Sequence, residues 1–491
     1  MKIDSKKSSS IWVLITRIVT VFFSIVYSIL SKYFLGDNAT SLIGSSAIVN
    51  SYNRYVDIAV EPIVSGITRR TPEYLEENKT EELKCLTNSS FTLSMIIALI
   101  ACIINLILGV FSDNDFTKML FFTMAFGSVF KVMNRFISVQ KSAVMQLVLL
   151  SRITTSTLIF TYLFSIFLIY SFGVIGFYIS TFLITSLSGI ILYSYFGFNK
   201  YSFQIDYTIL KESLLYSLPM LIFGFSEIFI FTLDKIILGN LIKIERLGVY
   251  NFSFQSSQIL FGLVISYFGS MYSYYVVDFN KFNTREKIFS FFNNEISKLL
   301  IFLSFFIIGL LVFFELITKY VLTDFINGLP TLYLFTTISI MFTSHYLFYV
   351  YLLVLKENLV LIKISLISIV ISSILFFTLY FHEGSIFSFA ILVVVLYFMR
   401  SFILVTIGSK SINNNKLIIL FITRVFSFSL IPFFYFLISY IKLSNDFLTT
   451  IFLKIIICGL VLFINIFLLE KGQEMLSEMV KIIKKNIDCF K

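Results

Sequence analysis

The chain has 491 residues, of which 58% are apolar and 13% are charged, and its mean hydropathy of +0.92 excludes a soluble globular domain. Its formal net charge of +10 would point to nucleic acid in a soluble chain. In a membrane protein the positive-inside rule explains this excess of Lys and Arg better, so no nucleic-acid partner is expected.

The N-terminal segment Met1–Ser10 is short and basic, and the apolar span after it is too long for a signal peptide. No small-residue cleavage site follows, so we expect an uncleaved first helix. Further apolar runs of roughly 20 residues, enough to cross a hydrocarbon core of about 30 Å, recur along the chain. We predict an all-α membrane protein with about fourteen transmembrane helices, near residues 11–34, 42–66, 86–111, 117–140, 147–170, 174–197, 214–238, 247–277, 296–318, 330–355, 359–381, 386–408, 417–441 and 447–469.

The connections between these spans differ in charge. Fourteen spans place both termini on one side, and the connections on that side are rich in Lys and Arg. The other set holds little beyond Lys243, Arg246, Lys319 and Lys442. By the positive-inside rule, both termini are predicted to be cytosolic. The outer connections are short, so no outer domain is expected.

The second span carries the strongest chemical signal. Ser46, Asn50, Arg54, Asp57 and Glu61 follow one another at steps of four, four, three and four, which is one face of a helix. A charge at the bilayer centre costs at least about 2.5–3.5 kcal/mol, so this stripe must face a water-filled cavity or a charged partner. An internal ion pair between Arg54 and Asp57 that merely fixes the helix is the alternative.

Other basic residues extend this signal within the first six spans. Lys131 and Arg135 share one face of the fourth span, and Arg17 lies in the first. Bases thus outnumber acids, and a cavity that they surround would attract an anion such as a pyrophosphate, which Arg can bind bidentately. Snorkelling of Lys131 and Arg135 to the inner leaflet is the alternative.

The later spans hold fewer polar residues. Glu227 lies in the middle of the seventh span, and Asp234 and Lys235 lie at its outer end. Gln255 and Gln258 share a face of the eighth, where amides suit sugar hydroxyls but can also join helices. His345 is interpreted as a hydrogen-bonded structural residue. The four cysteines and two histidines form no pattern typical of a metal site or disulfide.

The stretch around the seventh span also carries a family resemblance. A helix ending in Asp234-Lys235 and Leu238-Gly239 is followed, nine residues after the glycine, by Gly248-Val249-Tyr250. This resembles the start of the second half of a lipid-linked-oligosaccharide (O-antigen type) flippase of the polysaccharide transporter family. That family belongs to the multidrug/oligosaccharidyl-lipid/polysaccharide exporter (MOP) superfamily, with multidrug/cation antiporters and lipid II flippases.

A second copy of this motif earlier in the chain indicates an internal repeat. Lys32-Tyr33-Phe34-Leu35-Gly36, followed by Gly44, parallels the stretch from Lys235 to Gly239, followed by Gly248. The copies are six helices apart and so share one orientation, as in a parallel repeat about the membrane normal. We predict an N-terminal six-helix lobe (1–205), a C-terminal six-helix lobe (206–410), an additional helix pair (411–470) and a cytosolic tail (471–491). Hydrophobic residues among the lysines of this tail suit an amphipathic helix on the inner leaflet.

The resemblance implies a function. It predicts a flippase in the bacterial cytoplasmic (inner) membrane that moves undecaprenyl-pyrophosphate-linked oligosaccharide, an O-antigen or capsule repeat unit, to the outer leaflet by alternating access. Membrane lipids and other polysaccharide-assembly proteins are candidate partners. In related lipid II flippases the extra helix pair helps form a groove for the lipid tail, which makes Arg424 a candidate groove residue. No cofactor is expected, and coupling to Na⁺, H⁺, the membrane potential or nothing stays open.

Two other classes were weighed. A multidrug or cation antiporter could use Asp57, Glu61 and Glu227 for ion coupling. Its cationic substrate would, however, be repelled by Arg17, Arg54 and Lys131. A membrane enzyme is rejected, because no outer connection could carry an active site. The sequence also contains no nucleophile–His–acid set and no glycine-rich phosphate loop.

Overall fold

In the computed structural model, the described residues are 6–144, 146–197, 201–279, 285–355, 357–382, 384–409, 415–440 and 449–466, and they form helices and turns without a strand. Each of the fourteen predicted spans coincides with a helix in this part of the chain. The helices are α1 (Lys6–Leu35), α2 (Asn38–Glu76), α3 (Thr80–Val110), α4 (Asp115–Ala143), α5 (Leu147–Leu192), α6 (Tyr207–Leu241), α7 (Ile244–Phe279), α8 (Arg285–Tyr320), α9 (Leu329–Val354), α10 (Asn358–Phe381), α11 (Ile386–Ser409), α12 (Asn415–Tyr440) and a final helix Thr449–Ile466. Short π and 3₁₀ segments lie at Tyr193–Gly197 (η1) and Thr323–Gly328 (η2). The predicted amphipathic tail, residues 471–491, lies outside the described residues.

Two of these helices are interrupted. α5 contains two predicted spans that meet at Gly173, whose φ of 55° and ψ of −124° are accessible to glycine but strained for other residues. α6 bends by 52° between Leu215 and Ser217. Pro219 explains this bend, because its missing N–H leaves the carbonyl of Leu215 without a helical partner.

The predicted connection between the second and third spans is much too long. Helix α2 continues to Glu76 and α3 begins at Thr80, so the predicted connection over residues 67–85 is reduced to a short turn. Asn78 makes this turn with a φ of 56°, a left-handed conformation that Asn tolerates. Hydropathy marks where a helix leaves the membrane, not where it ends, so the polar continuation was missed.

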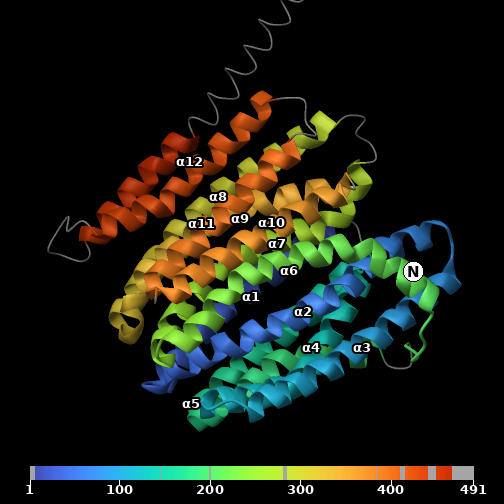
Figure 1. Cartoon of the computed structure of the whole chain (residues 1–491), viewed down its shortest axis with the longest axis horizontal. Coiled ribbons are helices and arrows are strands. Elements are labelled where there is room, and N and C mark those ends of the chain that lie inside the picture. The colour runs from blue at the N-terminus through green and yellow to red at the C-terminus, as the bar shows by residue number, and fades with distance from the viewer. Residues whose placement is uncertain are drawn as a thin grey trace, which may run out of the picture.

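The helices form two bundles, as Figure 1 shows. In the first, α2 packs on α4 and α1 packs on α5, while in the second α7 packs on α9 and α6 packs on α10. This is the same pairing six spans later, as the parallel repeat predicts. α12 and the final helix lie along the edge of the second bundle that faces away from the first (Figure 1). Nine helices in the described residues are long and apolar enough to cross a membrane, or ten if bent α6 counts as one span.

The bundles meet where α2 and α7 begin. A Cβ on Gly44 would overlap the carbonyl oxygen of Ile244, and a Cβ on Gly248 would overlap that of Thr40. Two hydrogen bonds between the bundles, Ser41 to Glu245 and Arg54 to Gln258, each join residues 204 positions apart. Gly44 and Gly248 have the same spacing, so these contacts join equivalent positions of the two repeats. We call this contact of α2 with α7 the interlobe seam.

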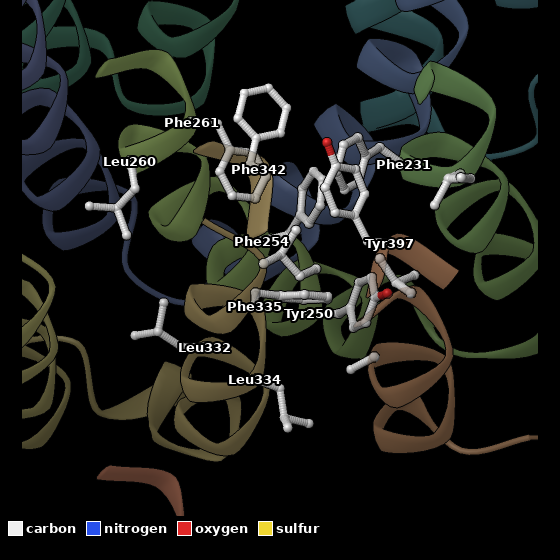
Figure 2. Close-up of a cluster of buried hydrophobic side chains, with 14 of the residues drawn as sticks. Phe231, Tyr250, Phe254, Leu260, Phe261, Leu332, Leu334, Phe335, Phe342 and Tyr397 are labelled. Atoms are coloured by element: carbon white, nitrogen blue, oxygen red, sulfur yellow. The ribbon is translucent and has the colours of Figure 1, made fainter. Parts of the chain in front are cut away.

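An aromatic core fills the second bundle (Figure 2). Phe231 of α6 stacks on Tyr397 of α11 with ring centroids 5.0 Å apart, and Phe254 of α7 meets Phe335 of α9 edge-on at 5.3 Å. Such ring pairs add about 0.5–1.5 kcal/mol beyond the area that they bury. The core therefore holds rigid the face of the second bundle that borders the functional site.

The additional helix pair is attached by a buried polar cluster. Lys454 of the final helix lies 2.6 Å from the carboxylate of Glu315 on α8, and the hydroxyl of Tyr435 on α12 donates to the same carboxylate at 2.6 Å. Glu315 is 6% exposed and Lys454 is 2% exposed. Breaking a buried pair by removing one partner costs about 3–5 kcal/mol, so this cluster specifies where the pair docks.

Candidate functional site

Three cavities follow one another along α2. The α1 cavity, of about 340 Å³, lies among α1, α2, α5 and α7. The central cavity, of about 260 Å³, lies among α2, α4, α6 and α7, and the α6 cavity, of about 230 Å³, is bordered by α2, α6 and α9. Asn50 and Gln255 line both of the first two cavities, and Asp57 lines both of the last two. The cavities are therefore neighbours along the polar face of α2.

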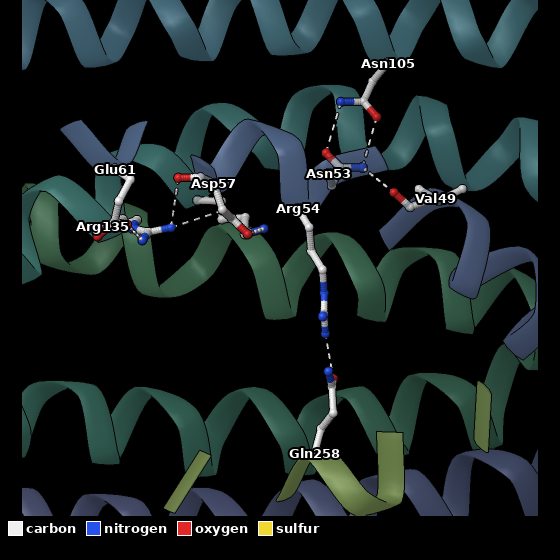
Figure 3. Close-up of polar contacts among 9 residues, drawn as sticks. Val49, Asn53, Arg54, Asp57, Glu61, Asn105, Arg135 and Gln258 are labelled. Carbon is white, nitrogen blue, oxygen red and sulfur yellow. Dashed lines mark hydrogen bonds and ion pairs between the residues drawn. The ribbon is translucent and has the colours of Figure 1, made fainter. Parts of the chain in front are cut away.

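Along the polar face of α2, acids of α2 pair with bases of α4 (Figure 3). Nζ of Lys131 lies 2.8 Å from Oδ2 of Asp57, and Arg135 pairs with Glu61. Arg135 also donates to the backbone carbonyl of Asp57 at 3.3 Å. Snorkelling to the inner leaflet is therefore the wrong interpretation of Lys131 and Arg135, because both point across the bundle to α2. Asp57 and Glu61 therefore compensate two of the bases that the sequence shows in excess.

Arg54 behaves differently from its neighbours. Its Nη2 donates to Oε1 of Gln258 on α7 at 2.6 Å, so the side chain crosses from the first bundle to the second (Figure 3). Its guanidinium also lies 5.8 Å from the ring of Phe254. The predicted alternative, an ion pair with Asp57 that fixes the helix, is not what the structure contains. Arg54 instead presents a guanidinium, held by a neutral amide, to the central cavity.

The second bundle adds one more base to this cavity. Nζ of Lys235 lies 3.4 Å from the ring centroid of Phe254 and 3.2 Å from both carboxylate oxygens of Asp234. Tyr250 donates a further hydrogen bond of 2.5 Å to Asp234. Asp234 is buried behind Lys235 and does not line the cavity. Both residues lie inside the second bundle, because α6 continues to Leu241 beyond the predicted end of the span.

The lining of the central cavity is positive. Among the described residues, three bases and one acid line it: Arg54, Lys131, Lys235 and Asp57. Asn50, Asn251, Gln255 and Gln258 supply amides. A guanidinium and two ammonium groups around one small space match an anion with several oxygens, and the amides match hydroxyl groups. Glu227, which was grouped with these residues, lines the α6 cavity instead, with Glu61 and Arg135.

Arg17, Arg424 and His345 lie away from the central cavity or outside the described side chains. Arg17 lies exposed on α1 and lines none of the three cavities, so the structure does not bring it to the group. Arg424 lies on α12, but its side chain is outside the described residues. His345 is buried and stacks on Phe223 at 5.3 Å, and its ring nitrogens make no hydrogen bond within the described part of the chain. The interpretation of His345 as a hydrogen-bonded residue is therefore wrong.

Besides Lys454, sequence reasoning missed two buried bases that border the cavities or their lining residues. Arg400 of α11 is 1% exposed, donates to the carbonyl of Phe223 at 3.1 Å and covers the ring of that residue at 4.6 Å. Lys32 of α1 lines the α1 cavity, but the predictions from the sequence name it only as part of the repeat motif. A charge inside an apolar span is by itself a signal of function, and that rule would have selected both. In the residues that the structure describes, no three His, Cys, Asp or Glu side chains form a metal-binding group.

Comparisons with known proteins bear on the family and on the fold. Residues 63–274 match a family described as polysaccharide biosynthesis protein. No curated protein matches the chain significantly by sequence. Among solved structures, an inward-facing multidrug resistance MATE family transporter of the MOP superfamily matches with a TM-score of 0.61 at 12% identity, covering 81% of this chain and 97% of that one.

Two further structures match over similar lengths. An outward-facing multidrug resistance MATE family transporter has a TM-score of 0.58 at 14% identity, covering 82% of this chain and 94% of its own. A MOP superfamily transporter from Pyrococcus furiosus Vc1 (DSM3638), described as having a binding pocket of reverse polarity that suggests a different function, has a TM-score of 0.58 at 13% identity, covering 82% and 95%. The predicted all-α, multi-pass membrane fold is thereby confirmed. The match of residues 63–274 to the polysaccharide biosynthesis family supports the family resemblance that the motifs indicate, and the chain has the fold of the MOP-superfamily transporters.

Proposed function

We propose that this protein is a flippase for undecaprenyl-pyrophosphate-linked oligosaccharide, and that it moves the polar head from the inner to the outer leaflet by alternating access of its two lobes. The observation that carries this proposal is the charge of the central cavity. Three bases, Arg54, Lys131 and Lys235, face one carboxylate, Asp57, at the boundary of the two lobes. A pyrophosphate supplies both the negative charge and the oxygen atoms that these donors require.

The packing of the lobes also suits a lipid-linked substrate. α2 packs against α6 far more extensively than α1 packs against α7, and the α1 cavity lies at this looser side. A head group can enter between α1 and α7 while its lipid tail stays in the bilayer. Both termini lie in the cytosol in this proposal, so α2 and α7 begin at the outer side and the interlobe seam closes that side.

The polarity of the cavity argues against a cation antiporter. In such a transporter free carboxylates would bind the cation, but two of the three candidate acids, Asp57 and Glu61, are occupied by Lys131 and Arg135, and the third, Glu227, lines the α6 cavity. The transporter from Pyrococcus furiosus is described as having a pocket of reverse polarity and a different function, so pocket charge varies within this fold. The experiment that tests the flippase also measures the activity expected of an antiporter.

The test compares variants of Arg54 in a deletion strain that depends on this gene for surface polysaccharide. Arg54→Gln removes the charge but keeps a partner for Gln258, so the protein should reach normal levels while lipid-linked oligosaccharide accumulates in the inner leaflet. A charge-assisted hydrogen bond contributes about 1.5–3 kcal/mol, so export should fall roughly tenfold or more. Arg54→Lys should restore export only in part, because an ammonium lacks the guanidinium fork.

Arg17→Gln is the matched control, because Arg17 carries the same group but lines none of the cavities. It should export normally. Resistance to cationic dyes is measured in the same strains, together with Glu227→Gln. Normal polysaccharide in Arg54→Gln, combined with dye sensitivity in Glu227→Gln, would refute the flippase and favour the antiporter.

A further inference from the structure

The α1 cavity differs chemically from the central cavity beside it. Among the described residues that line it, Lys32 is the only charged side chain, and no Asp or Glu is present. Hydroxyl groups make up much of the remaining polar wall, including those of Ser24, Ser28, Ser31, Thr181, Thr185 and Ser256. A wall of hydroxyl groups with one base is suited to a hydroxyl-rich ligand that carries a single negative charge.

Among the described residues, Lys32 is held by a hydroxyl group and aromatic rings, and no acid pairs with it. It is 5% exposed, its Nζ lies 2.5 Å from Oγ of Ser28, and it covers the ring of Phe252 at 4.2 Å. The equivalent base of the second repeat, Lys235, has Asp234 immediately before it, whereas Lys32 follows Ser31. A buried ammonium is costly when nothing neutralises it. The two repeats therefore share the base, at Lys32 and Lys235, but only the second repeat has an acid beside it.

We propose that the α1 cavity is a glycan subsite in which Lys32 binds an anionic group of the transported oligosaccharide, namely the carboxylate of an acidic sugar. This inference rests on the proposed function and names the substrate more closely. The central cavity offers a guanidinium and two ammonium groups, which match the several oxygen atoms of a pyrophosphate, and the single ammonium of Lys32 matches one carboxylate. Asn50 and Gln255 border both cavities, so a pyrophosphate and its first sugars can occupy the two at once.

The test uses the purified full-length protein in lipid nanodiscs and three probes. These are a disaccharide that contains glucuronic acid, the same disaccharide with the carboxyl reduced to an alcohol, and inorganic pyrophosphate. Binding is measured as the increase in thermal unfolding temperature with probe concentration. The native protein should bind the acidic disaccharide more tightly than the neutral one, by roughly ten- to a hundredfold, the effect expected of one charge-assisted hydrogen bond.

Substitutions test whether Lys32 causes the preference for the acidic disaccharide. Lys32→Met should abolish the preference and leave pyrophosphate binding unchanged, Lys32→Arg should retain it, and Lys243→Met, at an exposed lysine between α6 and α7, should behave like the native protein. Arg54→Gln should weaken pyrophosphate binding only. If pyrophosphate does not bind in an Arg54-dependent way, the proposed function fails, whereas Lys32-dependent binding of the acidic disaccharide would still support the subsite.

Two outcomes would overturn the subsite. One is equal binding of the two disaccharides by the native protein, a comparison that requires no variant to fold. The other is loss of pyrophosphate binding in Lys32→Met without any change toward the acidic disaccharide, which would assign Lys32 to the pyrophosphate.

Discussion

Replacing Gly248 with Ala tests whether the two lobes separate at the interlobe seam. An ideal Cβ at this position overlaps the carbonyl oxygen of Thr40 and lies 2.8 Å from its carbonyl carbon and 3.1 Å from its Cα. All three atoms belong to the backbone, so no side-chain rotation relieves the overlap and α2 must move away from α7. Gly44 meets the backbone of Ile244 in the same way.

The expected shift in the ratio of closed to open seam follows from this geometry. An added methyl in a well-packed contact costs about 1–3 kcal/mol. Only the state with a closed seam bears this cost, whereas the better helix propensity of Ala applies to both states and cancels. Since 1.4 kcal/mol is a factor of ten, the ratio of closed to open seam should fall roughly 5- to 150-fold.

Spin labels measure this shift directly. Asp37 and Lys243 are exposed and lie just before α2 and α7, so labels placed there report the separation of the helix ends by pulsed electron paramagnetic resonance. Gly248→Ala should move population from short to long distances. Gly262→Ala is the control on the same helix, because a Cβ there meets nothing within 4 Å. If folded Gly248→Ala keeps the native distance distribution, or if Gly262→Ala shifts it equally, the seam is not the moving contact.

Two other predictions concern the docking of the helix pair and the orientation in the membrane. Lys454→Met leaves the buried Glu315 carboxylate without its base and should destabilise the protein by about 3–5 kcal/mol. Adding Glu315→Gln should recover most of the loss in thermal unfolding temperature, and an unchanged unfolding temperature in Lys454→Met alone would contradict this. In a cysteine-free background, cysteines at Asp113 and Asn240 should react with an impermeant thiol reagent applied from outside and a cysteine at Glu77 should not, and the reverse pattern would invert the proposed orientation.

Much of the fold could be predicted from the sequence, because its signals are local. An apolar run of sufficient length forms a membrane helix whatever its neighbours, since backbone groups in lipid must be satisfied within the helix. The fourteen spans and the parallel repeat therefore appear correctly. The polar face of α2 is local too, because the spacing from Ser46 to Glu61 depends only on the helical period. What remained wrong was where α2 ends and where α8 begins, since both helices continue into polar sequence beyond the apolar span.

The partners of the site residues could not be predicted in this way. Periodicity identifies the face of a helix but not the helix that it meets, so an Arg54–Asp57 pair stood as an alternative. The packing of α2 against α4 supplied Lys131 and Arg135 to Asp57 and Glu61, and the crossing of α2 and α7 directed Arg54 to Gln258. The sequence alone thus determined which side chains are too costly to face lipid. Only the tertiary structure decided which charges cancel, because neutralisation requires atoms on different helices to lie within a few ångströms.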